Sequence, residues 1–544
     1  MDINKSGSDT HVSYNDVNGN DVELRNVARF RGTEHDENDM RTMGKTQQLN
    51  RNFRFLSILA FSCSAMSTWE FSLAASTFGL LNGGLAGLIW GYLFSWIGFL
   101  LVFASISEMA SISPTSGGQY HWGKDAIHLR TAKKLTVFTT VSEFAPPSCQ
   151  KFLSFLVGWL SVLGWQCGLA SLAFIDGTVI QGLIVLNDAT YVYERWHGSL
   201  LVIAILSFSV FFNTFLAQRL PMVEGSILVL HICGFFAIII PLWVLAPRNS
   251  AKQVFTEFQN LGGWSSQGLS FMVGLLSPIY TLLGVDSAVH MSEEIRDASL
   301  VLPRATFSAI LINGFFGYVM IITFCFTLGS PIDILSTYTG YPFIQSFYDA
   351  TGSYAGASIM VAIIITTITS SCISTVATVS RQLWSFARDN AMPFSPFIAH
   401  VIPGWKIPLN SVLLTLLITS LLSLINIGST VAFNAISSSS ITSLLTTYII
   451  SITCVILRRI RGPPLPPRRW SLGRFGLAIN IGSIVFLVVI YIFVLFPTST
   501  PVTLETMNWN CLIVGGTVIF AVAYYYAYGK KAYVGPVALV RRHN

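Results

Sequence analysis

Long apolar stretches, separated by short polar segments, fill most of this 544-residue chain. Twelve of them are long enough to cross the roughly 30 Å hydrocarbon core of a bilayer. None alternates like a β-strand, and only helices satisfy their own backbone hydrogen bonds at this length in lipid. We therefore predict an all-α polytopic membrane protein with twelve transmembrane helices. The predicted spans are residues 55–80, 86–107, 152–180, 199–216, 222–245, 270–290, 306–329, 355–380, 411–428, 431–457, 477–496 and 508–528.

The composition supports this prediction. Charged residues make up 11% of the chain and hydrophobic residues 52%, whereas an average soluble protein carries about 25% charged residues. So few charges cannot cover a water-soluble surface, and the bilayer must supply most of the solvent. We expect the polar residues 1–54 to form a disordered cytosolic tail. Residues 55–529 then form the membrane domain, and residues 530–544 form a cytosolic C-terminal tail.

The basic residues predict the orientation. An even number of spans places both termini on one side, and cytosolic loops are enriched in Lys and Arg. With the N-terminus in the cytosol, 29 of the 32 basic residues fall in cytosolic segments. The outer loops hold only Arg195, Arg248 and Lys252. The net charge of +6 therefore reflects membrane topology, and no nucleic-acid partner is expected.

The sequence carries no convincing motif of metal, cofactor or enzyme chemistry. The eight cysteines are scattered and form no CxxC pair, so we expect neither a metal site nor a disulfide framework. Gly44-Lys45-Thr46 resembles the end of a phosphate-binding loop, but Asp39 stands where its first glycine belongs. No serine-hydrolase elbow and no HExxH motif occurs. We expect no cofactor and no enzyme activity.

Acidic residues inside predicted spans are costly and usually functional, and two of them occupy comparable places in two spans. Glu70 lies midway through the first span, and Asp286 lies late in the sixth. These spans open two sets of five, as expected for a five-plus-five inverted repeat whose first helices are interrupted at the substrate site. The alternative is that both acids only pair with polar groups of the bundle. The expected substrate-binding residues are Ser67, Thr68, Trp69 and Glu70 at the first interruption and Gly284, Val285, Asp286 and Ser287 at the second.

Three segments at the ends of spans carry distinctive patterns. They are EMAS with PTSGGQYHW at 108–122, GVD with EE at 284–294, and R with FARD and P at 381–393. Together they resemble the amino acid–polyamine–organocation (APC) transporter superfamily. The patterns TWE at 68–70 and GWQ at 164–166 are most similar to its fungal-type amino acid/choline transporter family, which includes GABA permease-like members. This resemblance implies broken helices 1 and 6, alternating access and ion-coupled uptake of small amino-bearing solutes.

The first interruption departs from the pattern of many superfamily members. Theirs is a glycine-rich break that cradles a substrate carboxylate, whereas this chain has no glycine there and carries Glu70. The difference favours binding of a cation, because the ring of Trp69 can face an ammonium group. In the third span, Trp165 and Gln166 are further candidates for lining the site, and packing against a neighbouring helix is the alternative.

Four residues are candidates for gating and coupling. Glu108 lies at the predicted cytosolic mouth opposite Arg381 and Arg388, so we expect an ion pair that acts as a gate, unless these side chains are only solvated. His231 lies about ten residues into the fifth span, roughly 15 Å deep. Because imidazole changes its charge near neutral pH, His231 is a candidate proton relay, and a packing role is the alternative.

Residues 123–140 interrupt the resemblance between the second and third spans. In the family, the segment that resembles 120–122 runs directly into one that resembles 141–146. The extra eighteen residues can be encoded with GTAAG at Gly123-Lys124, CTAAC at Leu135-Thr136 and an acceptor AG before Val141. We interpret this insertion as a retained intron, and a genuine cytosolic loop is the alternative.

These patterns predict a secondary active transporter (permease) of an amino acid or a related amine such as GABA or choline, coupled to protons, in the plasma membrane. An organellar membrane is the alternative location. A non-transporting nutrient sensor on the same fold is the alternative function, although the two tails of about 54 and 15 residues are short for a folded domain. The expected partners are the small solute, a co-transported proton and the lipid bilayer. The sequence leaves the oligomeric state open.

The orientation is testable with reporters fused after Pro331, after Pro501 and at the C-terminus. Twelve spans with a cytosolic N-terminus predict that these positions lie outside, outside and inside, because the basic loops stay in the cytosol. Glycosylation and phosphatase reporters measure this in intact cells. An external C-terminus contradicts the twelve-span topology.

Overall fold

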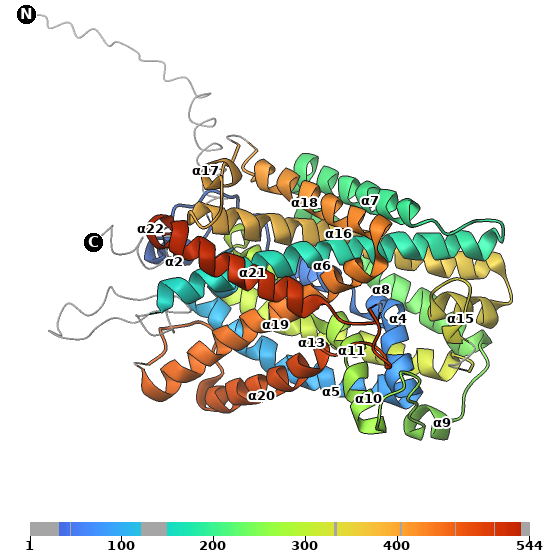
Figure 1. Cartoon of the computed structure of the whole chain (residues 1–544). Coiled ribbons are helices and arrows are strands. Elements are labelled where there is room, and N and C mark those ends of the chain that lie inside the picture. The colour runs from blue at the N-terminus through green and yellow to red at the C-terminus, as the bar shows by residue number, and fades with distance from the viewer. Residues whose placement is uncertain are drawn as a thin grey trace, which may run out of the picture.

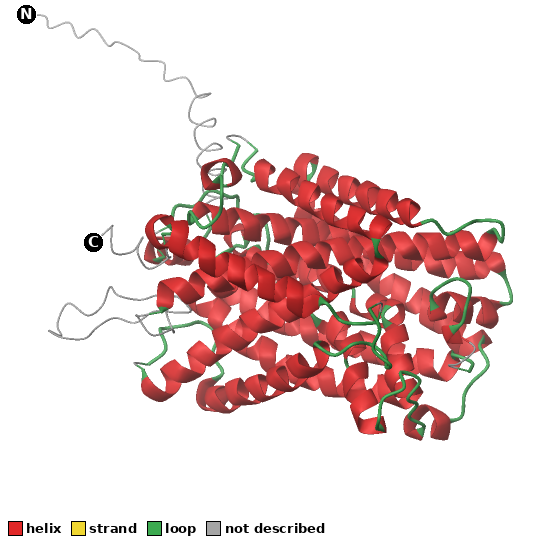
Figure 2. Cartoon of the chain, in the orientation of Figure 1, coloured by secondary structure: helices red, strands yellow, loops and turns green. Residues whose placement is uncertain are grey.

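The computed structural model describes residues 32–43, 45–120, 149–330, 334–402, 405–462, 464–504 and 506–534. Within these ranges the regular structure is helical, without a named strand, and most helices run along one common axis (Figures 1 and 2). The all-α fold expected from the sequence is confirmed. The suspected insertion at 123–140 lies outside the described residues.

Eleven helical segments in the described part of the chain are long and apolar enough to cross a membrane. The predicted first span is divided between two shorter helices, α3 (Phe55–Met66) and α4 (Thr68–Ala74). The chain is therefore a multi-pass integral membrane protein, while twelve crossings remain a prediction. The other spans are α5 (Ser76–Ile112), α6 (Gln150–Asn187), α7 (Arg195–Phe215), α8 (Leu220–Leu245), α10 to α12 (Gln267–Gly274, Leu276–Leu282 and Ser287–His290), α13 (Ala298–Thr327), α16 (Tyr354–Arg388), α18 (Leu409–Gly428), α19 (Thr430–Arg461), α20 (Gly476–Val494) and α21 (Asn510–Tyr524).

The two ends of the bundle differ in the short helices that they carry. The first and last described helices, α2 (Glu34–Thr42) and α22 (Lys530–Ala532), lie at the same end (Figure 1). The short helices α9 (Ala251–Thr256) and α15 (Pro342–Thr351) lie at the opposite end. An even number of crossings predicts this arrangement. We call the end with α2 the inner end, because the basic residues predict it to be cytosolic, and the other end the outer end.

Both predicted interruptions are present. Ser67 adopts left-handed dihedrals (φ 39°, ψ 50°) that end α3 and begin α4. In the sixth span, α11 ends at Leu282 and α12 begins at Ser287, and Gly284 between them has a φ of 97°. Glycine adopts this positive φ without steric cost, whereas the same region is strained at Ser67. The broken spans expected from the sequence are confirmed, and they leave backbone groups outside the helical hydrogen-bond ladders.

The second predicted span begins at a sharp turn rather than after a loop. Gly84 is the one residue of α5 with non-helical dihedrals (φ 64°, ψ −159°). A β-carbon there would lie 3.1 Å from the backbone nitrogen of Gln259, so the position needs both a positive φ and a small residue. The residues before Gly84 extend the first span, and those after it form the second.

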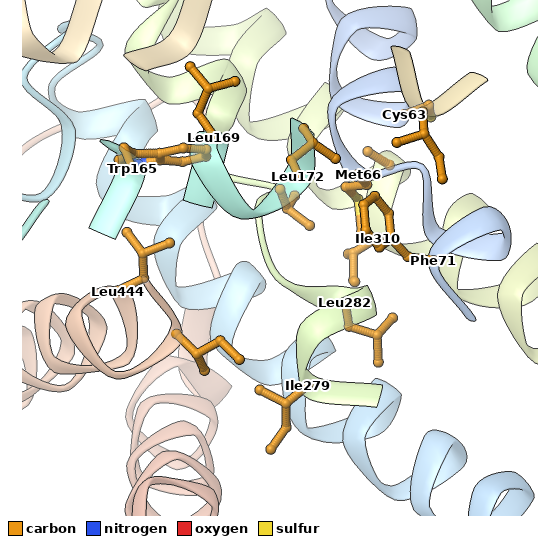
Figure 3. Close-up of a cluster of buried hydrophobic side chains, with 14 of the residues drawn as sticks. Cys63, Met66, Phe71, Trp165, Leu169, Leu172, Ile279, Leu282, Ile310 and Leu444 are labelled. Carbon is orange, nitrogen blue, oxygen red and sulfur yellow. The ribbon is translucent and has the colours of Figure 1, made fainter. Parts of the chain in front are cut away.

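Apolar side chains from six helices meet around the two interruptions (Figure 3). In lipid, helices associate through close packing rather than through exclusion of water, so the fit of these side chains determines how the broken helices are held. The labelled members are Cys63 and Met66 of α3, Phe71 of α4, Trp165, Leu169 and Leu172 of α6, Ile279 and Leu282 of α11, Ile310 of α13 and Leu444 of α19.

The expectation of disorder over residues 1–54 is wrong for the part that contains α2. The buried Asp36 of this helix accepts hydrogen bonds from the backbone N–H groups of Asp297 (2.8 Å) and Ala298 (3.0 Å). It also pairs with Arg51 at 3.3 Å. The N-cap residue of α13, Asp297, makes no side-chain cap, so Asp36 caps that helix from a distant part of the chain. Residues 32–43 are polar because their partners are polar, and composition alone does not reveal this.

Removal of this cap is expected to release the N-terminal segment from the inner end. Asp36→Ala deletes a cap worth about 1 kcal/mol and leaves the guanidinium of Arg51 buried without its carboxylate. We expect faster tryptic cleavage between residues 41 and 54 and a lower melting temperature of the purified protein. Glu37→Ala, an exposed change on the same helix, is the matched control. Equal cleavage of the two variants contradicts the docking of this segment.

Candidate functional site

A cavity lies where the two interruptions meet. Its walls come from α3, α4, α6, α11, α16 and α19 and from the non-helical residues Leu283 and Gly284. Of the residues predicted to bind substrate, Trp165 and Gly284 line this cavity. The packing of broken helices against α6 and α16 therefore creates an opening inside the membrane domain.

The lining of the cavity is aromatic and neutral. Phe71, Trp165 and Tyr280 contribute rings, Thr375 and Ser440 contribute hydroxyls, and none of the lining residues is charged. The rings of Phe71 and Tyr280 are 5.9 Å apart. The Ser440 hydroxyl donates to the carbonyl of Gly164 at 2.8 Å, which fixes its rotamer. Such a lining is suited to a small ammonium group, because aromatic faces attract cations.

A second cavity continues from the first toward the outer end. The two cavities share Tyr280 and Ile441. The second one is bounded by Thr498, Met507 and Asn508, which belong to the connection between α20 and α21. We therefore expect a solute to reach the central cavity from the outer end, past the second cavity.

Asp286 does not line the central cavity. Its carboxylate accepts hydrogen bonds from Gln119 Nε2 at 2.5 Å and from the Tyr448 hydroxyl at 2.6 Å. Both donors are neutral and buried. The expectation that Asp286 faces the solute directly is therefore not met in this conformation, because two neutral side chains from other elements occupy its oxygens. Neither Gln119 nor Tyr448 was anticipated from the sequence.

Glu70 and Trp69 face α8 rather than the cavity. The imidazole Nδ1 of His231 lies 2.8 Å from the carboxylate of Glu70. The ring of Trp69 packs against those of His231 (5.7 Å) and Phe235 (6.0 Å). The sequence treats Glu70 as a substrate ligand and His231 as a separate relay, and the structure joins them in one buried pair. On this short helix it is Phe71 that faces the cavity.

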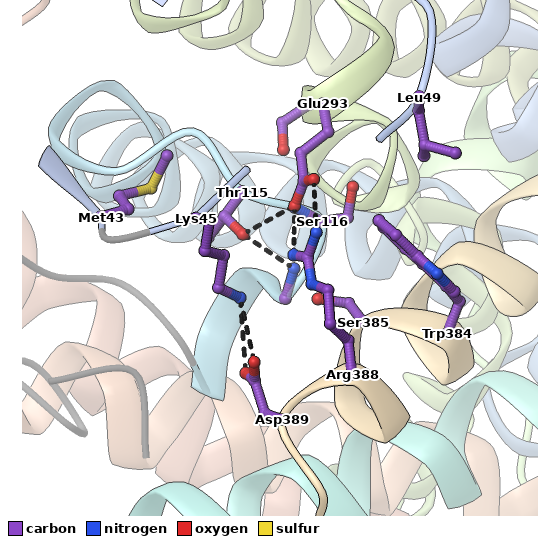
Figure 4. A network of polar contacts seen from close by, with 12 residues as sticks. Met43, Lys45, Leu49, Thr115, Ser116, Glu293, Trp384, Ser385, Arg388 and Asp389 are labelled. Atoms are coloured by element: carbon purple, nitrogen blue, oxygen red, sulfur yellow. Dashed lines mark hydrogen bonds and ion pairs between the residues drawn. The ribbon is translucent and has the colours of Figure 1, made fainter. Parts of the chain in front are cut away.

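Buried ion pairs close the inner end (Figure 4). Arg388 donates two hydrogen bonds to Glu293, at 2.7 and 2.8 Å. Burial alone would raise the pKa of Glu293, but Arg388 and Lys45 hold it at about 2, so this carboxylate stays ionised. Lys45, from the N-terminal segment, lies 3.3 Å from Asp389, and burial lowers the pKa of its amine to about 8. The exit of the sixth span, the end of α16 and the N-terminal segment are thus tied together.

The predicted gate between Glu108 and the arginines of α16 is not formed. Arg381 donates to Glu294 at 2.8 Å instead. Glu108 accepts from Arg468 Nε at 2.7 Å and also from Arg459. Arg459 lies in the last turn of α19, and Arg468 lies in the basic Pro-rich segment that follows this helix. This segment folds across the inner end of α5. The prediction is wrong because the basic segment after α19, rather than the end of α16, reaches Glu108.

The other predicted residues support the helices rather than the cavity. These residues form hydrogen bonds with hydroxyl and backbone groups near the two interruptions, or they are buried there. The Ser67 hydroxyl donates to the Ser64 carbonyl (2.9 Å), the Gln166 amide donates to Thr415 (3.3 Å), the Ser287 carbonyl accepts from Thr378 (3.4 Å), and Thr68 and Val285 are fully buried.

Two buried carboxyl groups were not recognised as site candidates from the sequence. Asp176 of α6 accepts from the Thr369 hydroxyl at 2.5 Å. Glu224 of α8 accepts from the Ser374 hydroxyl at 2.9 and 3.0 Å. The rule that selected Glu70, namely an acid within an apolar span, applies equally to these two residues. Across the described ranges, no group of three or more His, Cys, Asp or Glu side chains is placed to hold a metal ion.

Comparison with known proteins agrees with this architecture. The model of the amino acid permease family matches residues 53–518. The chain is 27% identical to a choline transporter of Saccharomyces cerevisiae, covering 89% of this chain and 83% of the relative. It is 24% identical to amino-acid permease 2 of Neurospora crassa (93% and 90%) and 29% identical to amino-acid permease BAT1 of Arabidopsis thaliana (92% and 96%). The chain belongs to the amino acid permease family, whose members are transporters rather than enzymes.

The route to the outer end is testable by thiol labelling. In a background without the exposed Cys233 and Cys511, Ser440→Cys should react with a membrane-impermeant thiol reagent applied from the outer side. It should not react from the inner side, because ion pairs close that end. Ser483→Cys, a buried serine of α20 outside the cavity, is the control. Faster labelling of Ser440→Cys from the inner side contradicts the described route.

Proposed function

We propose that this permease is a secondary active transporter of an amino acid or a related small amine such as GABA or choline. The observation that supports the proposal is the central cavity, where three aromatic rings and no charged residue surround the space between two broken helices. A solute that brings its own positive charge gains about 0.5–2 kcal/mol from an aromatic face. The names of the choline transporter and amino-acid permease relatives agree with this solute class.

The proposed mechanism is alternating access. The second cavity adjoins the central one beside the connection between α20 and α21, whereas the pairs Glu293–Arg388 and Glu294–Arg381 lie at the inner end. Release of the solute inward requires these pairs to separate. Because each leaves buried charges when it opens, separation needs water or new partners to enter at the same time. A transporter built in this way avoids a continuous pore.

Coupling to protons is proposed from the pair of Glu70 and His231. Both side chains are buried, and they lie on the side of the first span that faces away from the cavity. Imidazole and carboxyl side chains are the groups that carry protons in many transporters, so this pair is the proposed carrier of the coupled proton. A proton held here does not compete with the solute for space. We place the transporter in the plasma membrane, where a proton gradient can drive uptake.

Uptake of labelled solutes into vesicles with an imposed pH gradient tests the proposal. Choline, GABA and a panel of amino acids should include at least one solute that accumulates above equilibrium when the outer side is more acidic. A nutrient sensor on the same fold would bind a solute without accumulating it. Trp165→Leu and Phe71→Leu should each raise KM for a cationic solute roughly 2- to 30-fold. Phe208→Leu, an exposed ring of α7, is the matched control.

The same assay examines the role of His231. His231→Gln should permit exchange of labelled for unlabelled solute and abolish accumulation driven by the pH gradient. If this variant accumulates solute in response to the pH gradient as the wild type does, His231 has only a packing role. Accumulation of no solute by the wild-type protein, at normal surface expression, contradicts the proposed function itself.

A further inference from the structure

Glu224 is a fully buried carboxyl group without a cationic partner in the described part of the chain. Most other buried acids have one: Glu293 pairs with Arg388, Glu294 with Arg381, and Asp389 with Lys45. Glu224 instead accepts from the neutral hydroxyl of Ser374, which lies 2.9 and 3.0 Å from its two oxygens. Isolated ionised carboxyl groups are costly inside a bilayer, so this one must be protonated or solvated.

The hydroxyl groups around Glu224 can accommodate a protonated carboxyl. The Ser64 hydroxyl of α3 also contacts Glu224. Ser64 Oγ donates its hydrogen to the carbonyl of Ala60 at 2.8 Å, so its lone pairs are available as an acceptor. A carboxylic acid can accept from Ser374 and donate to Ser64 at the same time. A carboxylate cannot donate to Ser64, and it can bond this hydroxyl only if the hydroxyl turns away from the Ala60 carbonyl.

No charged group on the neighbouring elements neutralises Glu224. His231 lies seven positions further along α8 and is bonded to Glu70. Along the inner half of α8, helix α3 offers only the thiol of Cys63. Helix α16 offers the thiol of Cys372 and the guanidinium groups of Arg381 and Arg388, which are paired with Glu294 and Glu293. Arg219 and Arg304, at the inner ends of α8 and α13, are exposed.

Glu224 lies directly behind the wall of the central cavity. On α16, Ser374 contacts Glu224, and the next residue, Thr375, lines the cavity. On α3, Ser64 contacts Glu224, and the next residue, Ala65, lines the cavity. The two helices are also joined at this level, because the Ser371 hydroxyl donates to the Ala65 carbonyl at 3.0 Å. Gain or loss of a proton at Glu224 therefore acts on two residues, each of which is directly followed in sequence by a residue of the cavity wall.

We propose that Glu224 is a proton-binding site linked to the solute cavity through α3 and α16. The inference rests on the proposed function, and it names a coupling site separate from the pair of Glu70 and His231. A proton from the outer solution binds the carboxylate and gives the acid described here. When the inner end opens, the acid loses this proton to water on that side. The carboxylate then draws the hydroxyls of Ser64 and Ser374 toward itself, which loosens the Ser64–Ala60 bond and the wall that it supports.

The variant Glu224→Gln tests the proposal in the full-length protein in vesicles. Glutamine keeps the size of the side chain, accepts from Ser374 and donates to Ser64, but it carries no titratable proton. We expect solute exchange at equal pH to persist. Accumulation driven by one pH unit, up to about tenfold in the wild type for one proton per solute, should fall to the equilibrium level. The pH dependence of KM should also disappear.

The control variant is Asp176→Asn. Asp176 is another buried acid of a span that accepts from a hydroxyl, that of Thr369, and it does not line the cavity. This variant should accumulate solute as the wild type does. Wild-type accumulation by Glu224→Gln overturns the proposal. Accumulation that follows a sodium gradient instead of a pH gradient also overturns it. If the wild-type protein transports none of the solutes, the proposed function itself is contradicted, and with it the role of Glu224.

A second variant covers the case in which Glu224→Gln does not reach the membrane. Ser374→Ala removes a donor that favours the ionised form of Glu224 and leaves the carboxyl group in place. The pH midpoint of KM should therefore move upward, by about one unit for a charge-assisted hydrogen bond. An unchanged midpoint, at unchanged surface expression, overturns the role of Glu224.

Discussion

Every part of this structure depends on one constraint, which is that a polar group inside a bilayer needs a partner from the protein. The two interruptions at Ser67 and around Gly284 break the helical ladders in the middle of the bundle. The freed groups are supported by hydroxyls of neighbouring helices, as in the bond from Ser371 to the carbonyl of Ala65. Because such support surrounds a cavity, the same arrangement that makes the breaks tolerable also creates the space in which a solute can bind.

At the inner end, the buried groups that need partners carry full charges. Glu293 with Arg388, and Asp389 with Lys45, are buried pairs that would be costly to separate singly. They join the sixth span, α16 and the N-terminal segment, so opening of one contact exposes partners of the others. The inner closure is therefore expected to open as a unit rather than residue by residue. Asp36 extends this unit by capping α13 from outside the membrane domain.

Sequence patterns predicted the spans and both interruptions because length, hydropathy and the acids within apolar stretches are local properties. They did not predict which way the side chains of α4 point. Adjacent helical residues differ by about 100° around the axis, so the rotation of one short helix decides whether Glu70 or Phe71 faces the cavity. The partners of Glu108 and Asp36 come from segments hundreds of residues away. No local pattern encodes these pairings, and only the packed structure reveals them.

The separation of acids from the cavity has a consequence for selectivity. A carboxylate in the lining would attract protons and cationic solutes to one position, and the two would exclude each other. Here Phe71, Trp165 and Tyr280 form the lining, whereas Glu70 and Glu224 lie behind the wall. The proposed solute and proton sites can then be occupied at the same time, which the proposed symport requires. A neutral lining also accepts zwitterions and monovalent cations alike, so discrimination among amines falls to the shape of the aromatic walls and not to a charge.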